Sequence, residues 1–202
     1  MNKSVKYILP AIEFDMGGFP VKQSIPTQRV DQIDPFLLLH HAVVKFTDRK
    51  KAKDQGVGPH PHRGFSPVTF VIQGEVRHRD SRGHDQIAKS GEVQWINSGA
   101  GIIHSERPSE ELIKGDKTQE IIQLWINTPA KFKMYPPEYH YFPEDQITVF
   151  LSEDKQVFNK LISGTYNGLT GNMKSHSEVI IIWGSSKEKG TIAYNVPSGY
   201  NS

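Results

Sequence analysis

The chain has 202 residues, of which 36% are apolar and 23% are charged, with a formal net charge of +2. This composition is that of a globular protein, and the near-zero charge excludes a strong electrostatic attraction to nucleic acid or anionic lipid. The chain has no cysteine, which excludes disulfides, thiolate metal sites, iron–sulfur clusters and a cysteine nucleophile. Any transition metal must therefore be held by imidazole and carboxylate groups.

Short runs of β-branched and aromatic residues, separated by turn-forming residues, recur along the chain, whereas helical periodicity is almost absent. One helical turn is expected at 108–112, in the sequence PSEEL. Short strands with glycine-rich turns are typical of an antiparallel sandwich or barrel, so we predict an all-β fold. The predicted strands are 66–73, 75–80, 92–97, 119–127, 147–151, 179–183 and 191–196.

A proline-rich stretch interrupts this strand pattern after the first two thirds of the chain. Because paired prolines cannot continue a strand ladder, we interpret residues 134–145 as a linker. It separates an N-terminal domain at 1–133 from a C-terminal segment at 146–202, which is close to the lower size limit for a domain that folds by itself. No stretch approaches the roughly 20 apolar residues of a membrane span, and the first residues make a poor signal peptide. We therefore expect a cytoplasmic protein with no membrane partner.

Two segments place metal-ligating side chains two residues apart. The first, HPHRGF, contains His60 and His62, and the second, GAGIIHSE, contains His104 and Glu106. Residues two apart in an extended chain project from the same face, so each pair presents two donor groups to one point. If the two strands face one another inside a barrel, three imidazoles and one carboxylate converge. That set suits Fe(II), Mn(II), Ni(II), Cu(II) or Zn(II), and the glycines before His104 allow the turn that delivers its strand into the barrel.

The other candidate residues are not expected to bind the metal. His78 and His84 flank the polar turn SRGHD, and we expect both to be exposed turn residues rather than ligands. Phe65, Gln94 and Trp95 are expected in the core or the wall of the barrel, from where a wall residue also lines the pocket. The sequence contains no glycine-rich phosphate loop and no nucleophile elbow.

The segments HPHRGF, VTFVIQGEVRHRDS and SGEVQWINSGAGIIHSE resemble the signature of the pirin family in the cupin superfamily. The similarity extends outward through DPFLLL, QLWIN and the paired prolines, and weakly into the C-terminal segment. It implies two stacked cupin β-barrels of the double-stranded β-helix (jelly-roll) type, with one metal ion, usually iron, in the N-terminal barrel. The residues that match the family's metal ligands are His60, His62, His104 and Glu106, the same four that their spacing selects.

The resemblance also implies an activity. Pirins have been reported as quercetin 2,3-dioxygenases, so we expect a flavonol substrate whose ring is opened by O2 with release of carbon monoxide, and Glu106 as the group that takes the hydroxyl proton. Animal members have been described as nuclear, iron-dependent modulators of transcription factors. A non-enzymatic iron-binding or redox-sensing protein that acts through a protein partner therefore stays open, as does a structural remnant without turnover. Direct nucleic-acid binding is not expected at this net charge.

The sequence departs from the family pattern at three places. Ser66 and Pro67 follow HRGF, where the family usually has an acidic residue, and His40 and His41 follow DPFLLL, where it usually has an aspartate. We expect the two histidines either to alter the wall of the pocket or to add a hydrogen-bond donor behind the metal ligands. Family members also continue beyond VPSGYN, so we expect a complete N-terminal barrel and a partial, truncated C-terminal barrel. The physiological substrate, the identity of the metal and the oligomeric state stay open.

Overall fold

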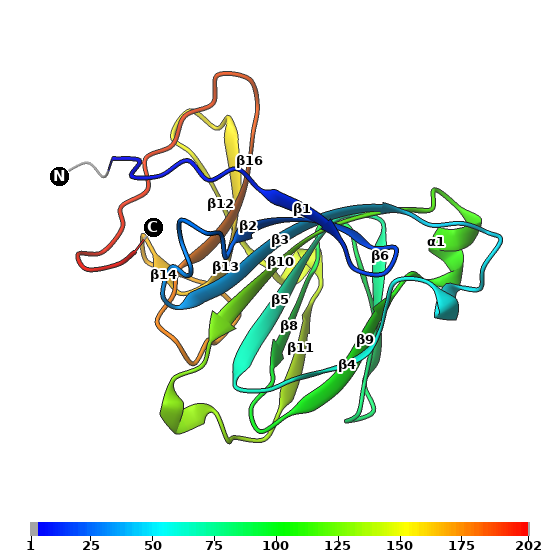
Figure 1. The fold of residues 1–202 in the computed structure, drawn as a ribbon. Helices are drawn as coiled ribbons and strands as arrows, with labels where there is room; N and C mark the ends of the chain where they lie inside the picture. The colour runs from blue at the N-terminus through cyan, green and yellow to red at the C-terminus, as the bar shows by residue number, and fades with distance from the viewer. Residues whose placement is uncertain (1–3, 202) are drawn as a thin grey trace. The chain divides into compact units, whose positions relative to one another are not determined.

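The computed structural model describes residues 4–201 (Figure 1). The chain divides into two compact units, Met1–Tyr141 and Phe142–Ser202. Nearly all of the regular structure is β, which confirms the predicted all-β fold. Six of the seven predicted strands have a counterpart in the structure.

Two antiparallel sheets form the first unit. The larger sheet has the strand order β1-β2-β3-β10-β5-β8-β11, and the smaller sheet has the order β4-β9-β6-β7. Figure 1 shows β4 and β9 running side by side across from β5 and β8. The strands of the larger sheet are β1 (Ile12–Asp15), β2 (Pro20–Ile25), β3 (Phe36–Lys45), β5 (Phe65–Gln73), β8 (Val93–Asn97), β10 (Thr118–Asn127) and β11 (Glu138–Phe142). Those of the smaller sheet are β4 (Val57–His62), β6 (Glu75–Asp80), β7 (Asp85–Lys89) and β9 (Ile102–Arg107).

The interior between these sheets is divided between an apolar core and polar groups. The core cluster draws small and branched side chains from both sheets, and burying them supplies the main stabilisation of the unit. Its members are Phe19, Val21, Ala42, Val44, Phe46, Ala52, Val71, Val76, Ala88, Leu112, Ile113 and Ile121. The one α-helix among residues 4–201, α1 (Glu110–Lys114), begins after Ser109, whose side chain accepts a hydrogen bond from the Leu112 amide. This helix confirms the helical turn predicted at 108–112.

The second unit is also built from strands. A three-stranded sheet has the order β12-β13-β16, and a short hairpin joins β14 to β15. The strands are β12 (Thr148–Leu151), β13 (Val157–Ser163), β14 (Thr165–Tyr166), β15 (Leu169–Thr170) and β16 (Ile181–Ser186). Short 3-10 helices lie at η1 (Ala52–Asp54), η2 (Ala130–Phe132) and η3 (Glu144–Gln146). Within residues 4–201, no helix has the length and apolar character needed to cross a membrane.

Two of the predicted elements differ from the structure. The expected linker at 134–145 contains β11, which joins the larger sheet beside β8. The prolines at 136, 137 and 143 lie just outside this strand and do not interrupt its hydrogen bonds. The strand is also at the edge of the sheet, where prolines are tolerated. The strand predicted at 191–196 is wrong. The backbone amides of Thr191 and Asn195 bond to the side chains of Asp154 and Tyr166 instead of to a neighbouring strand.

The turn that leads into β9 requires a glycine. Gly99 has a φ of +48°, and a Cβ at this position would lie 2.0 Å from the backbone oxygen of Tyr135. The variant Gly99→Ala must both adopt left-handed backbone and displace that carbonyl. We therefore expect it to lower the unfolding free energy by about 3 kcal/mol or more.

The control is Gly83→Ala, because Gly83 has a φ of +93° but no atom within 4 Å of the added Cβ. This variant should cost only about 1–2 kcal/mol of backbone strain. Urea denaturation of both variants measures the difference. Equal losses would contradict the close contact between the turn at Gly99 and the segment at Tyr135.

Candidate metal centre

The pairing of β4 with β9 brings three histidines together. His60 lies directly opposite His104 in the antiparallel register, and His62 shares the face of His60 because it is two residues along the strand. The ring centroids of His60, His62 and His104 lie 4.4 to 4.8 Å apart. One nitrogen from each ring falls within a group of atoms that all lie within 4.8 Å of one another. The structure therefore brings together three of the four residues that the sequence selected as ligands.

The hydrogen bonds of these imidazoles leave nitrogen lone pairs directed at a common point. His60 Nδ1 lies 2.8 Å from the carbonyl oxygen of Gly58, which can only accept, so Nδ1 carries the proton and Nε2 is bare. That Nε2 lies 3.1 Å from His62 Nε2 and accepts a hydrogen bond from it, so a metal ion bound here would replace the His62 proton. The buried Nε2 of His104 has no hydrogen-bond partner within the described part of the chain. A divalent transition metal binds convergent imidazole nitrogens and displaces any proton on them, so this cluster can hold a metal ion.

Glu106 lies two residues beyond His104 on β9 and is held by the opposite sheet. Its carboxylate accepts a hydrogen bond of 3.0 Å from Thr69 Oγ1 and one of 2.9 Å from Gln123 Nε2. Trp125 Nε1 donates to Gln123 Oε1 at 2.9 Å, which directs the Gln123 amide nitrogen toward the carboxylate. The group of atoms within 4.8 Å consists of the three imidazoles without Glu106. Thr69 and Gln123 therefore fix this carboxylate beside the cluster.

Burial keeps His62 and His104 neutral. Burial lowers the pKa of His62 to about 3, and repulsion from His104 and His60 adds to this shift, while Glu106 opposes it. Burial likewise lowers the pKa of His104 to about 3. The side chains are correspondingly inaccessible, with His62 5% and His104 2% exposed. Neutral imidazoles at ordinary pH are the form that binds a metal ion.

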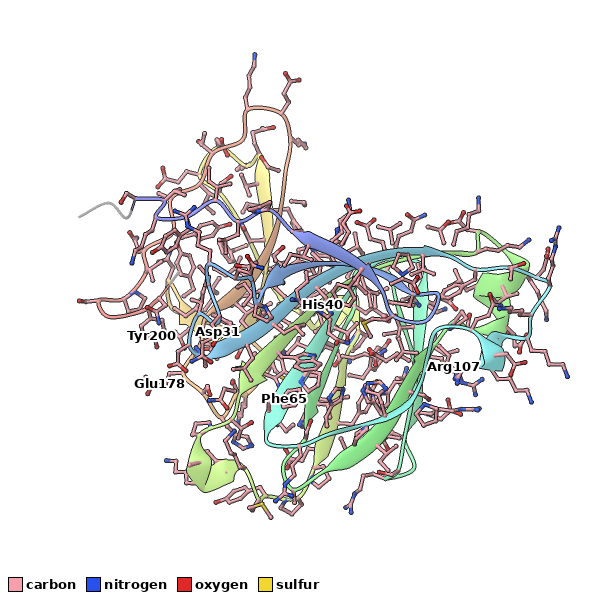
Figure 2. The ribbon with its side chains drawn as sticks, viewed as in Figure 1. Asp31, His40, Phe65, Arg107, Glu178 and Tyr200 are labelled. Carbon is pink, nitrogen blue, oxygen red and sulfur yellow. The ribbon has the colours of Figure 1, made fainter. Side chains whose placement is uncertain are left out.

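A largely apolar cavity of about 520 Å³ opens beside the cluster. Phe65 and Trp125 stack in its wall with ring centroids 4.4 Å apart, and both rings meet the His62 ring edge-on. Figure 2 marks Phe65 at the start of β5 and His40 on β3, and both residues line the cavity. The full lining is Phe14, Met16, Phe19, Val21, His40, Ala42, Val57, His60, Pro61, His62, Phe65, Glu106, Ile121, Gln123 and Trp125.

The structure places the candidate wall residues differently from one another. Phe65 lines the cavity, whereas Gln94 and Trp95 do not. Trp95 is fully buried and donates its indole N–H to Asn97, and Gln94 donates to the carbonyl oxygen of Val76. Both side chains are therefore used in the packing between the sheets and do not reach the cavity.

The exposed position expected for His78 is wrong, whereas His84 is exposed. His78 is 0% exposed, and its ring lies 4.1 Å from that of Tyr139 in a nearly parallel stack. On β6 it shares the buried face of Val76, a two-residue alternation that was visible in the sequence EVRHRD. The side chain of His84 is 43% exposed. The sequence interpretation also missed Thr69 and Gln123, whose signal is a polar residue on the inward face of an otherwise apolar strand.

Comparisons with known proteins identify relatives along most of the chain. The family model described as Pirin matches residues 18–126. The chain is 37% identical over 186 residues to the Pseudomonas aeruginosa protein named "Putative quercetin 2,3-dioxygenase PA2418", which covers 91% of this chain and 64% of that protein. It is 32% identical over 197 residues to "Pirin-like protein 2" of Arabidopsis thaliana, which covers 98% of this chain and 57% of that protein. The chain thus spans less than two thirds of the length of either relative.

A solved structure shows the same fold. The crystal structure of quercetin 2,3-dioxygenase from Acinetobacter baumannii matches with a TM-score of 0.78 at 34% sequence identity. The match covers 87% of this chain and 62% of that chain. The jelly-roll cupin architecture expected from the sequence is therefore confirmed.

The lowered pKa values predict how the stability of the metal-free protein depends on pH. Below pH 6.5, His62 and His104 are protonated in the unfolded chain but neutral in the folded one, so the unfolded state binds more protons. The unfolding free energy should therefore fall as the pH drops from about 6.5 toward 3, by up to about 1.4 kcal/mol per pH unit for each histidine.

Urea denaturation of metal-free protein between about pH 7 and pH 5 tests this expectation. The variant His62→Gln removes one of the two titrating groups and should flatten the pH dependence by up to about 1.4 kcal/mol per unit. An unchanged slope in the variant would mean that His62 does not resist protonation in the folded protein.

Proposed function

The chain belongs to the pirin family, and from that premise we propose that it is a metal-dependent flavonol dioxygenase. The observation that carries the proposal is the cluster of His60, His62 and His104, two of them buried, next to a cavity lined by aromatic side chains. A metal site that opens into an apolar cavity combines a place for an ion with a place for a planar organic substrate. The names of two relatives, from Pseudomonas aeruginosa and Acinetobacter baumannii, point to the same chemistry.

We propose His60, His62, His104 and Glu106 as the ligands of one divalent ion, with Fe(II) as the first candidate. The donor set also suits Mn(II), Ni(II), Cu(II) and Zn(II). When bound there, such an ion supplies Lewis acidity, which lowers the pKa of a coordinating hydroxyl and leaves coordination positions open for substrate. The unpartnered Nε2 of His104 supports this assignment, because a buried imidazole nitrogen without a partner is unfavourable unless a ligand satisfies it.

The protein's own residues orient the substrate and move its proton. The stacked pair of Phe65 and Trp125 offers a flat apolar surface beside the histidines, against which the rings of a flavonol can lie. Glu106 is the proton acceptor for the 3-hydroxyl group, held in place by Thr69 and Gln123. The apolar lining excludes water, which favours reaction with O2 over competing hydrolysis.

The proposed reaction consumes one flavonol and one O2. Both oxygen atoms enter the product, the central ring opens to an ester, and one ring carbon leaves as carbon monoxide. Protein reconstituted with Fe(II) should consume quercetin under air and release carbon monoxide in equal amount, as measured by absorbance and gas analysis. Protein that binds the metal but leaves quercetin and its analogues unchanged would contradict the enzymatic proposal and favour an iron-binding regulatory protein.

Removing one imidazole should remove the metal without unfolding the protein. The variant His62→Ala should lose more than about 100-fold in Fe(II) affinity, because a ligand contributes more than the outer groups whose loss costs 10–100-fold. Its folding should change little, since the core cluster lies apart from His62. Elemental analysis and circular dichroism measure these two effects.

The matched control is His41→Ala, which alters a partly exposed histidine on β3 that pairs with Glu120 and does not line the cavity. This variant should keep the metal content of the unaltered protein. Full metal occupancy in His62→Ala would show that the proposed ligand set is wrong.

A further inference from the structure

Three side chains behind the histidine cluster form a continuous hydrogen-bonded line. Asp80 Oδ2 lies 2.8 Å from His78 Nε2, and His78 Nδ1 lies 3.3 Å from His104 Nδ1. The side chains of Asp80 and His78 are both 0% exposed, and His104 is 2% exposed. These side chains are not accessible to water, so the hydrogen bonds between them determine which nitrogen atoms carry protons.

The carboxylate fixes the direction of this line. A carboxylate only accepts hydrogen bonds, so His78 Nε2 carries a proton and donates to Asp80. His78 Nδ1 then faces His104 Nδ1 at 3.3 Å, so one of these two nitrogens donates to the other. A proton on the buried His104 Nε2 would have no acceptor among the described residues, so the proton lies on His104 Nδ1 and His78 Nδ1 accepts. His104 Nε2 is therefore without a proton.

We propose that Asp80 and His78 are positioning residues that hold His104 in the tautomer whose Nε2 lone pair faces the metal ion. This inference rests on the proposed metal centre, because the role assigned to the His104 lone pair is to coordinate the metal ion. The tautomer of His60 is set by a different group, since its Nδ1–H donates a hydrogen bond to the Gly58 carbonyl. Groups behind a metal ligand that select its tautomer raise its affinity for the metal.

The surroundings of Asp80 and His78 fix both groups in place. Asp80 Oδ1 accepts hydrogen bonds from the backbone amides of Arg82 and His84, at 2.9 and 3.1 Å. Oδ2 faces His78 and also lies 2.8 Å from the ring Nδ1 of His84. The ring of Tyr139 lies parallel to the His78 ring at 4.1 Å. Asp80 also lies directly opposite His104 in the pairing of β6 with β9, so the backbone register sets the spacing of the line.

The variant Asp80→Asn tests the direction of the line. Because the amides of Arg82 and His84 need the remaining oxygen, the new amide nitrogen turns toward His78 and reverses both histidine tautomers. His104 Nε2 would then carry a proton. We expect Co(II) affinity, measured by competition with a chelator, to fall by about 10–100-fold. Affinity within twofold of the unaltered protein would overturn the proposal.

The matched control is Asp85→Asn, which makes the same change at a carboxylate that pairs with Arg77 and Arg79 and does not touch the line. Its Co(II) affinity should stay within twofold of the unaltered protein. A loss as large as that of Asp80→Asn would show that any change of charge on this sheet weakens the site, and would overturn the specific role of Asp80.

A second pair of variants decides the question if Asp80→Asn fails to fold. In His78→Asn, the amide oxygen stands near the place of Nδ1 and still accepts a hydrogen bond from His104, whereas His78→Leu offers no acceptor. We expect His78→Asn to bind Co(II) at least about 10-fold more tightly than His78→Leu. Equal affinities would overturn the proposal.

Histidine tautomers in the metal-free protein provide a readout that needs no variant. Nitrogen-15 NMR of the imidazoles should show His78 protonated at Nε2 and His104 protonated at Nδ1. A proton on His104 Nε2 would overturn the inference. If the unaltered protein fails to bind Co(II), the proposed function fails, while the tautomer measurement still decides whether the line exists.

Discussion

The antiparallel pairing of β4 with β9 is the constraint on which the rest of the site depends. It sets His60 opposite His104 and leaves His62 on the same inward face, so three imidazoles meet without any long side chain having to reach. The turn at Gly99, which only a glycine fits, directs β9 into this register. A shift of the pairing register by one residue in either strand would point its ligand side chains to the opposite face of the sheet, and the three imidazoles would no longer meet.

Burying imidazoles in an interior is unfavourable unless their polar atoms are satisfied, and the structure satisfies two of the three from behind. The Gly58 carbonyl bonds to His60, and the line from Asp80 through His78 bonds to His104. Each of these contacts uses the nitrogen that points away from the cluster. The same burial that keeps the rings neutral therefore leaves their inward nitrogens available for a metal ion. Packing, hydrogen bonding and protonation state all favour one arrangement of ligands.

Much of this architecture could be predicted from the sequence, because half-buried strands show an alternation of apolar and polar residues. β10 was predicted almost to its bounds, and the spacing of two residues in the two histidine segments was enough to place three ligands on facing strands. The buried position of His78 was missed because an adjacent polar turn dominated the interpretation. The strand expected at 191–196 failed because periodicity cannot show whether a partner strand is present to complete a ladder. An inward polar residue such as Gln123 can be noticed in the sequence, but its partner across the sheets, here Glu106, cannot be read from the local pattern.

The proposed metal centre consists of one divalent ion held by three imidazoles and the Glu106 carboxylate. X-ray absorption spectroscopy of the chain reconstituted with Fe(II) tests it most directly, because imidazole rings give a distinct multiple-scattering pattern. We expect one bound iron with three imidazole ligands and a carboxylate oxygen among the remaining donors. Iron surrounded by oxygen donors without imidazole scattering would contradict the assignment of the site.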